Sequence, residues 1–297
     1  MHEIDKILTA CRTMDRGVVV TVIRTHGSTY RRAGARAVIS EAGQAFGAIS
    51  GGCLERDLAE RIKPWLADMK PRVVTYDSTR SDDLVFGLGL GCRGILELFV
   101  QPFDAAHPPR ILGFQWNGRE SVEWVTTLPD GEQVLELIRP QRAIVIFGGG
   151  LDVEPLVQLA MQIGWRADVV TTRDPIDVGD YDAAIVMTHN FHRDVELLPR
   201  LLATSIPYIG LLGPKRRADE LFAEANVARD PRVHAPIGLD LGSDTPEEIA
   251  LSIVAEIQAV LNQRSTRPLR ELDEPIHSRR ALATAATLRS VDDATPE

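Results

Sequence analysis

The chain has 297 residues, of which 44% are hydrophobic and 25% charged, and its formal net charge is −9. This composition is typical of a globular protein and excludes a disordered or fibrous chain. Binding to a phosphate backbone needs an excess of Lys and Arg on one face, so the acidic balance argues against nucleic-acid binding. At roughly 100–200 residues per domain, the length predicts two domains.

The sequence also predicts a cellular compartment. No apolar run approaches the roughly 18 residues that cross a bilayer, and the N-terminal segment has mixed charge. The cysteines Cys11, Cys53 and Cys92 are odd in number and widely spaced, which does not suggest a disulfide framework. We therefore expect a cytoplasmic protein with free thiols and no membrane association.

Residues 1–102 are expected to form a mixed α/β domain. Apolar residues recur at helical intervals over 3–16, where Cys11 lies on the apolar face and is expected in the core. Strand patterns follow over 18–23, over a hairpin made of 35–40 and 44–50, and over 71–77 and 95–100.

The loop over 24–36 is a candidate anion site. It combines two glycines, three Ser or Thr residues and four arginines. Arginine offers a bidentate fork to a phosphate and a glycine-rich backbone offers N–H donors, so Ser28, Arg31 and Arg32 are candidate ligand-binding residues. The alternative is a solvated loop with scattered surface arginines.

The stretch 48–55 carries the first candidate thiol. An apolar strand runs into Gly51, Gly52 and Cys53, and from Leu54 onward the apolar residues recur at helical spacing. Cys53 thus lies at an expected helix N-terminus, where free N–H groups and the helix dipole favour a thiolate and the glycines let a ligand approach the backbone. The alternative is a small buried cysteine in a tight turn.

A second cysteine, Cys92, lies beside Gly91 in the glycine-dense run 86–94, which predicts a loop. No CxxC motif or nearby His pair accompanies either cysteine, so the spacing is not a zinc pattern. It is compatible with two loops that converge on one ligand, with both thiols as soft donors toward a metal or a sulfur carrier.

Residues 103–141 are expected to connect the two domains. They open with a proline-containing, linker-like segment. Asn117-Gly118 is a strong turn dipeptide between two apolar runs and predicts a hairpin over 110–127.

From Arg142 strands alternate with helices, which predicts a Rossmann-like domain with a parallel sheet over 142–262. The strand 143–147 leads into Gly148, Gly149 and Gly150, then a helix over 151–163 and a strand over 167–172. This turn is only part of the dinucleotide fingerprint, because Val153 replaces the third glycine and no acid ends the second strand. Bound NAD(P), a bound anion and an empty fold all stay open.

His189 follows a further strand, 183–187. Because the carboxyl ends of strands line the crevice in such sheets, His189 is a candidate ligand contact, with helix capping as the alternative. Thr245-Pro246-Glu247-Glu248 is a capping box that introduces a helix over 249–261. The polar, charged segment 263–297 is expected to be a mobile tail.

Together these motifs resemble the XdhC/CoxI family, the xanthine dehydrogenase accessory factors. The resemblance covers roughly 4–102 and 142–262 and rests on seven motifs, which are Gly27–Gly34, Ser50–Glu55, Gly89–Gly94, Phe147–Gly150, Met187–His189, Ile209–Gly213 and Pro236–Gly242.

The resemblance implies a cytoplasmic chaperone that binds the molybdenum cofactor, as molybdopterin or its dinucleotide form, protects its sulfurated form and hands it to a molybdenum hydroxylase such as xanthine dehydrogenase. By the same analogy Cys53 and Cys92 hold the cofactor, and they are the candidate ligands of its molybdenum. A cysteine desulfurase is a further expected partner, and a homodimer is expected.

Two other functions stay open. An NAD(P)-dependent oxidoreductase is indicated by Gly148–Gly150 and His189. An adaptor that binds only other proteins, with an empty Rossmann fold, is the third. The residues favour a cofactor-binding chaperone over a catalyst.

Overall fold

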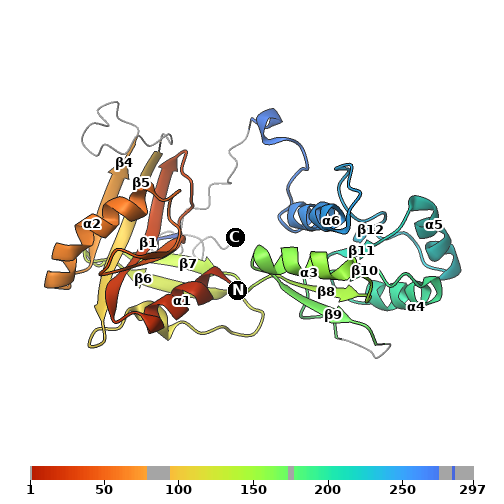
Figure 1. The fold of residues 1–297 in the computed structure, drawn as a ribbon, viewed down its shortest axis with the longest axis horizontal. Helices are drawn as coiled ribbons and strands as arrows, with labels where there is room; N and C mark the ends of the chain where they lie inside the picture. Colours follow the sequence, from red (N-terminus) through yellow and green to blue (C-terminus); the bar gives the residue numbers. More distant parts are fainter. Residues whose placement is uncertain (1, 79–93, 173–176, 274–282, 285–297) are drawn as a thin grey trace, which may run out of the picture. The chain divides into compact units, whose positions relative to one another are not determined.

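The computed structural model describes residues 2–78, 94–172, 177–273 and 283–284. It divides into two compact units, His2–Pro140 and Gln141–Ile276 (Figure 1), and each unit has its own apolar core. Residues 103–140 fall within the first of these units.

The first unit is built on a five-stranded antiparallel sheet in the order β3-β2-β1-β5-β4. Its strands are β1 (Arg16–Gly27), β2 (Arg36–Ser40), β3 (Ala45–Gly47), β4 (Arg72–Asp77) and β5 (Gly94–Asp104). β2 and β3 pair as an antiparallel hairpin, which confirms that prediction.

A helix covers each face of this sheet. On one face α2 (Cys53–Asp68) packs Leu58 and Ile62 into a cluster with Val20. On the other face α1 (Glu3–Thr13) packs Ile7 into a cluster with Val19. Cys11 is buried there, and burial raises the pKa of its thiol to about 12, which confirms it as a core residue.

The predicted hairpin around Asn117-Gly118 is wrong. Residues 110–113 form a short 3₁₀ turn, η2 (Arg110–Gly113), and the hairpin lies further on, where β6 (Val122–Thr127) pairs with β7 (Gln133–Ile138). The apolar run that suggested a strand instead buries Ile111 and Phe114 in the cluster under α1. Asn117-Gly118 still forms a turn, closed by the Glu120 N–H on the Asn117 carbonyl at 3.0 Å, but burial of Ile111 and Phe114 keeps the preceding run from pairing as a strand.

The β6–β7 hairpin packs on the same face of the sheet as α1. Leu128 and Val134 form a cluster with Ile23 and Phe99. The short strand β13 (Ala283–Thr284) pairs antiparallel with β7, and η3 (Leu269–Glu271) is a 3₁₀ turn. These parts of the expected tail therefore have regular backbone structure, and 274–282 and 285–297 lie outside the described residues.

The second unit has a five-stranded parallel sheet in the order β12-β11-β10-β8-β9, which confirms the Rossmann-like prediction. The helices α3 (Val153–Gln162) and α6 (Pro246–Leu261) cover one face, and α4 (Phe191–Leu202) and α5 (Lys215–Glu224) cover the other (Figure 1). The strands are β8 (Ala143–Phe147), β9 (Arg166–Val170), β10 (Ala183–Val186), β11 (Ile209–Leu211) and β12 (Val233–His234).

The strand order reverses between β8 and β10, which is where doubly wound sheets bind ligands. α6 begins with the predicted capping box, in which Thr245 and Glu248 exchange hydrogen bonds.

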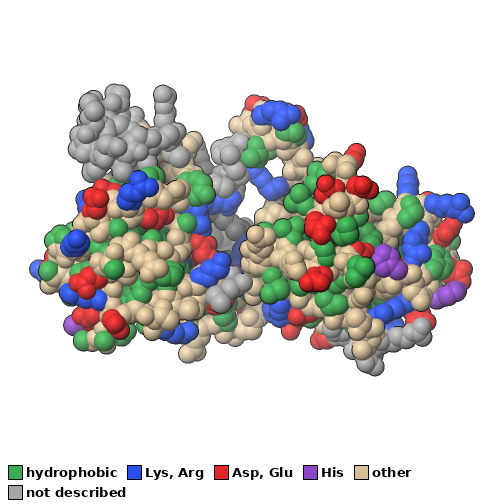
Figure 2. All heavy atoms as spheres, viewed as in Figure 1, with side chains coloured by type: hydrophobic (Ala, Val, Ile, Leu, Met, Phe, Trp, Pro, Cys, Tyr) green, Lys and Arg blue, Asp and Glu red, His purple; other side chains and the backbone are tan. Residues whose placement is uncertain are grey.

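Acidic and basic side chains intermingle over the face shown in Figure 2. Within the described ranges, no helix has both the length and the apolarity to cross a bilayer.

Candidate functional site

Three strand ends of the first unit lie at one end of its sheet. Gly27 at the end of β1 pairs with Gly94 at the start of β5, and Asp77 at the end of β4 pairs with the neighbouring Ile95. The arginine-rich loop, which follows β1, therefore lies at the same end of the sheet as Asp77 and Gly94.

Contacts at Gly94 hold this edge together. The Ser78 hydroxyl donates to the Gly94 carbonyl at 2.7 Å and accepts from its N–H at 3.0 Å. A Cβ atom at Gly94 would lie 2.4 Å from the Ser28 carbonyl oxygen, so only glycine permits this close approach. The arginine-rich loop is thus seated directly on the start of β5.

Cys53 is the first residue of α2, as the sequence predicts for a helix start. Gly52 precedes it with φ 107°, a conformation that favours glycine. Ser50 Oγ accepts hydrogen bonds from the N–H groups of Gly52 at 3.0 Å and Leu54 at 3.1 Å, and Cys53 Sγ lies 3.6 Å from the same oxygen. The half-buried thiol packs against the apolar cluster beneath α2.

A buried carboxylate stabilises this turn. Glu55 Oε1 accepts the N–H groups of Ile49 and Ser50 at 2.8 Å each, and Oε2 accepts the Ser50 hydroxyl. Burial alone would raise the pKa of Glu55, but these hydrogen bonds outweigh burial and hold the pKa below its usual value. Glu55 is therefore a structural anion that orders residues 49–54.

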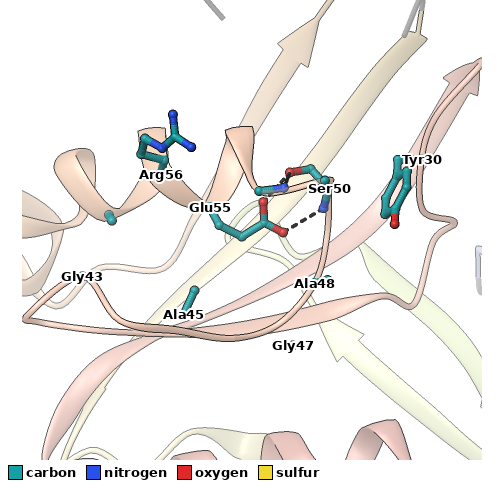
Figure 3. A pocket seen from close by; sticks show the side chains of 11 residues that line it. Tyr30, Gly43, Ala45, Gly47, Ala48, Ser50, Glu55 and Arg56 are labelled. Atoms are coloured by element: carbon teal, nitrogen blue, oxygen red, sulfur yellow. Dashed lines mark hydrogen bonds between the residues drawn. The ribbon is translucent and has the colours of Figure 1, made fainter. Parts of the chain in front are cut away.

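An open cavity of about 540 Å³ lies beside the turn (Figure 3). Small-molecule sites typically measure roughly 300–1,000 Å³. Its lining is mostly glycine and alanine, including Gly47, Gly51 and Gly52, with Tyr30 and Arg56 as the large side chains. The structure thus places both predicted glycines on a cavity wall, whereas Cys53, the next residue in the chain, is not among the lining residues.

The other predicted residues of this unit have different surroundings. Arg31 Nη2 donates to both carboxylate oxygens of Glu3 in α1, at 2.6 and 2.8 Å, so its charge already has an anionic partner. Arg32 and Ser28 are exposed. Gly91 and Cys92 lie outside the described residues, and the two-thiol site stays a prediction. In the parts of the chain that are described, no cluster of three His, Cys, Asp or Glu side chains suits a metal ion.

Sequence reasoning missed Tyr30, Glu55 and Arg56. An acid in the first turn of an expected helix was a signal for Glu55 as a residue that hydrogen-bonds the preceding backbone. Tyr30 lies in the candidate loop 24–36, but neither it nor Arg56 could be singled out, because only the folded chain brings them to one cavity.

The structure also brings Gly150 and His189 together in the second unit. A Cβ atom at Gly150 would lie 3.3 Å from the His189 ring, and His189 Nε2 lies 2.8 Å from Asp152 Oδ2. His189 has a φ of 55°, and Asp152 is the residue just before α3. The Asp152 carboxylate makes no capping hydrogen bond to the first turn of α3 and contacts the His189 ring instead.

The two cavity glycines should respond differently to alanine. In Gly52→Ala the positive φ strains the backbone, and we expect the free energy of unfolding to fall by about 1–2 kcal/mol. Gly51→Ala is the matched control, since its Cβ would meet open space and its φ is not positive, so a change within about 0.5 kcal/mol is expected. Urea titration of both variants measures the difference, and equal losses would contradict the assigned backbone conformation.

Comparison with known proteins places both units in one family. Residues 10–77 match the model of the XdhC and CoxI family, and residues 144–257 match that of the XdhC Rossmann domain. The chain is 29% identical to a probable xanthine dehydrogenase subunit of Bacillus subtilis (strain 168), over 82% of this chain and 92% of that protein.

Two further relatives agree. The molybdenum cofactor insertion chaperone PaoD of Escherichia coli (strain K12) is 24% identical, over 82% of this chain and 83% of PaoD. A crystal structure described as a xanthine dehydrogenase from Bacillus halodurans is 28% identical and superposes with a TM-score of 0.77, over 90% of this chain and 97% of that one. With its N-terminal motifs and its Rossmann domain both matched, the chain belongs to the XdhC and CoxI family.

Proposed function

We propose that this protein is an accessory chaperone that binds the sulfurated molybdenum cofactor and delivers it to a molybdenum hydroxylase of the xanthine dehydrogenase type. The names of two relatives, a cofactor insertion chaperone and a xanthine dehydrogenase subunit, support this role. The observation that carries the proposal is the glycine-lined cavity next to Cys53.

The chemistry of the cavity and of the neighbouring Cys53 suits this cargo. Molybdenum and its sulfido ligand are soft, and a cysteine thiol is a soft donor. Gly51 and Gly52 present backbone without side chains, so a ligand can come close to the turn. In this proposal Cys53 and Cys92 hold the cofactor, and the protein protects its sulfurated form.

Further parts of the proposal concern partners and domains. Residues 1–102 would form the cysteine-bearing domain and 142–262 a Rossmann-like domain, in a cytoplasmic homodimer that meets the apo-hydroxylase and a cysteine desulfurase. The turn after β8 argues against the NAD(P)-dependent oxidoreductase, because Val153 replaces the third glycine of the dinucleotide fingerprint and no acid ends β9.

Cofactor retention tests the proposal. We expect the wild type, mixed anaerobically with molybdenum cofactor and separated by gel filtration, to retain molybdenum and pterin. Cys53→Ala and Cys92→Ala should each lower retention by at least about tenfold. Loss of a residue that only hydrogen-bonds a metal ligand already lowers metal affinity by about that factor. Cys11→Ala is the matched control, because its thiol lies in the core under α1. A wild type that retains no pterin would refute the proposal.

A further inference from the structure

Tyr30 is an exposed aromatic residue at the cavity. Its side chain is 61% exposed, although a large ring on the surface leaves apolar area in water. The Thr29 hydroxyl donates to the Arg31 carbonyl at 2.9 Å, a hydrogen bond that spans the backbone of Tyr30. The ring lines the cavity with much of its surface open to a ligand.

Arg56 is the cationic residue of the same cavity. It extends from α2, and Figure 3 shows it on the other side of Ser50 and Glu55 from Tyr30. Two other arginines near α2 pair with acids, Arg61 with Asp57 and Arg72 with Asp68. Among the described residues no carboxylate lies within ion-pair distance of Arg56, so its guanidinium has charge to offer an anion.

Two glycines of the same cavity leave room for a ligand. Cβ atoms added at Gly51 or Gly52 would meet nothing within 4 Å, so the backbone there faces open space. Both oxygens of Glu55 already accept hydrogen bonds from the turn, which reduces their repulsion of an incoming anion.

We propose that this cavity is the pterin subsite, in which the pterin ring stacks on Tyr30 and Arg56 binds the phosphate that the pterin carries. Fused heteroaromatic rings stack on tyrosine as nucleobases do, and arginine binds phosphate through two parallel N–H bonds. This inference rests on the proposed function and deepens it, because that function assigned no residue to the ring or to the phosphate.

The test compares four variants of the full chain in the anaerobic retention experiment. Tyr30→Ala should weaken cofactor binding about tenfold, within the range for the loss of one stacked base, while Tyr30→Phe keeps the ring and should bind as the wild type does. Arg56→Ala should weaken binding about tenfold, with a smaller effect at high salt, and Arg56→Lys should recover part of it. Both side chains are on the surface, and thermal unfolding of the four variants should show unchanged stability.

Two matched controls change similar residues that do not line the cavity. Phe46→Ala removes an exposed ring of β3, and Arg12→Ala removes an exposed arginine of α1, and both should bind as the wild type does. If the wild type retains the cofactor and Tyr30→Ala and Arg56→Ala retain it equally well, the subsite is wrong and the proposed function stands.

Two other results would also overturn the subsite. A wild type that retains no cofactor removes the proposed function and the subsite with it. The second is release of the cofactor by millimolar inorganic phosphate together with a Tyr30→Ala variant that binds the cofactor as tightly as the wild type does. That result would show that the cavity recognises only the phosphate.

Discussion

Replacing Arg36 by alanine is expected to lower the free energy of unfolding of the first unit by about 3–5 kcal/mol, the cost of leaving one buried charge without its partner. Arg36 is 5% exposed and lies at the start of β2. Its Nη1 donates to Glu136 Oε1 at 3.1 Å and to the Gly34 carbonyl at 3.0 Å, and its Nη2 donates to Glu136 Oε2. Removal of Arg36 therefore strands the Glu136 carboxylate between β7 and the sheet.

A double-mutant cycle measured by urea titration checks this result. Glu136→Leu combined with Arg36→Met should recover much of the loss, because an apolar pair of similar volume needs no desolvation of charge. Arg216→Ala is the control, since its pair with Glu220 is exposed and should contribute below about 1 kcal/mol. A loss in Arg36→Ala no greater than in Arg216→Ala would contradict the buried pair.

The Arg36–Glu136 pair also shows why the position of the hairpin cannot be predicted from the sequence. Helix starts and strands with strong local patterns, such as Cys53 at α2 and the capping box at α6, could be predicted because their signals lie within a few residues. The β6–β7 hairpin is instead selected by contacts with β1, β2 and β5, which are distant in the chain. A turn dipeptide such as Asn117-Gly118 carries no information about contacts with strands that are distant in the chain.

The candidate site divides in the same way. Gly51, Gly52 and Cys53 could be identified because a glycine turn before a helix is a local pattern. Tyr30 and Arg56 share a cavity only after β1 and α2 are in place. In the same way, the contact between Asp152 and His189, whose φ is positive, forms only in the folded chain. Side chains that act together across loops are visible only in the fold.

Glu55→Ala is expected to lower the free energy of unfolding by about 3 kcal/mol and to disorder the turn that carries Cys53. Hydrogen bonds to a charged acceptor contribute roughly 1.5–3 kcal/mol each, and they are not additive. The substitution leaves the buried N–H groups of Ile49 and Ser50 and the Ser50 hydroxyl without their acceptor. Glu60→Ala, an exposed acid on the same helix, should change stability by less than about 0.5 kcal/mol.

The pH dependence separates the charge of Glu55 from its packing. Because its folded pKa lies below the unfolded value of about 4.3, the unfolded chain binds more protons between the two pKa values, and stability rises with pH there. The contribution of Glu55 is thus complete above the unfolded pKa and is lost as the pH falls through the folded pKa. Urea titrations from pH 7 to pH 3 should show the stability advantage of wild type over Glu55→Gln shrinking below about pH 4. If the advantage stayed constant to pH 3, Glu55 would act through its shape. The interpretation that a Glu55 carboxylate stabilises the turn before Cys53 would then be wrong.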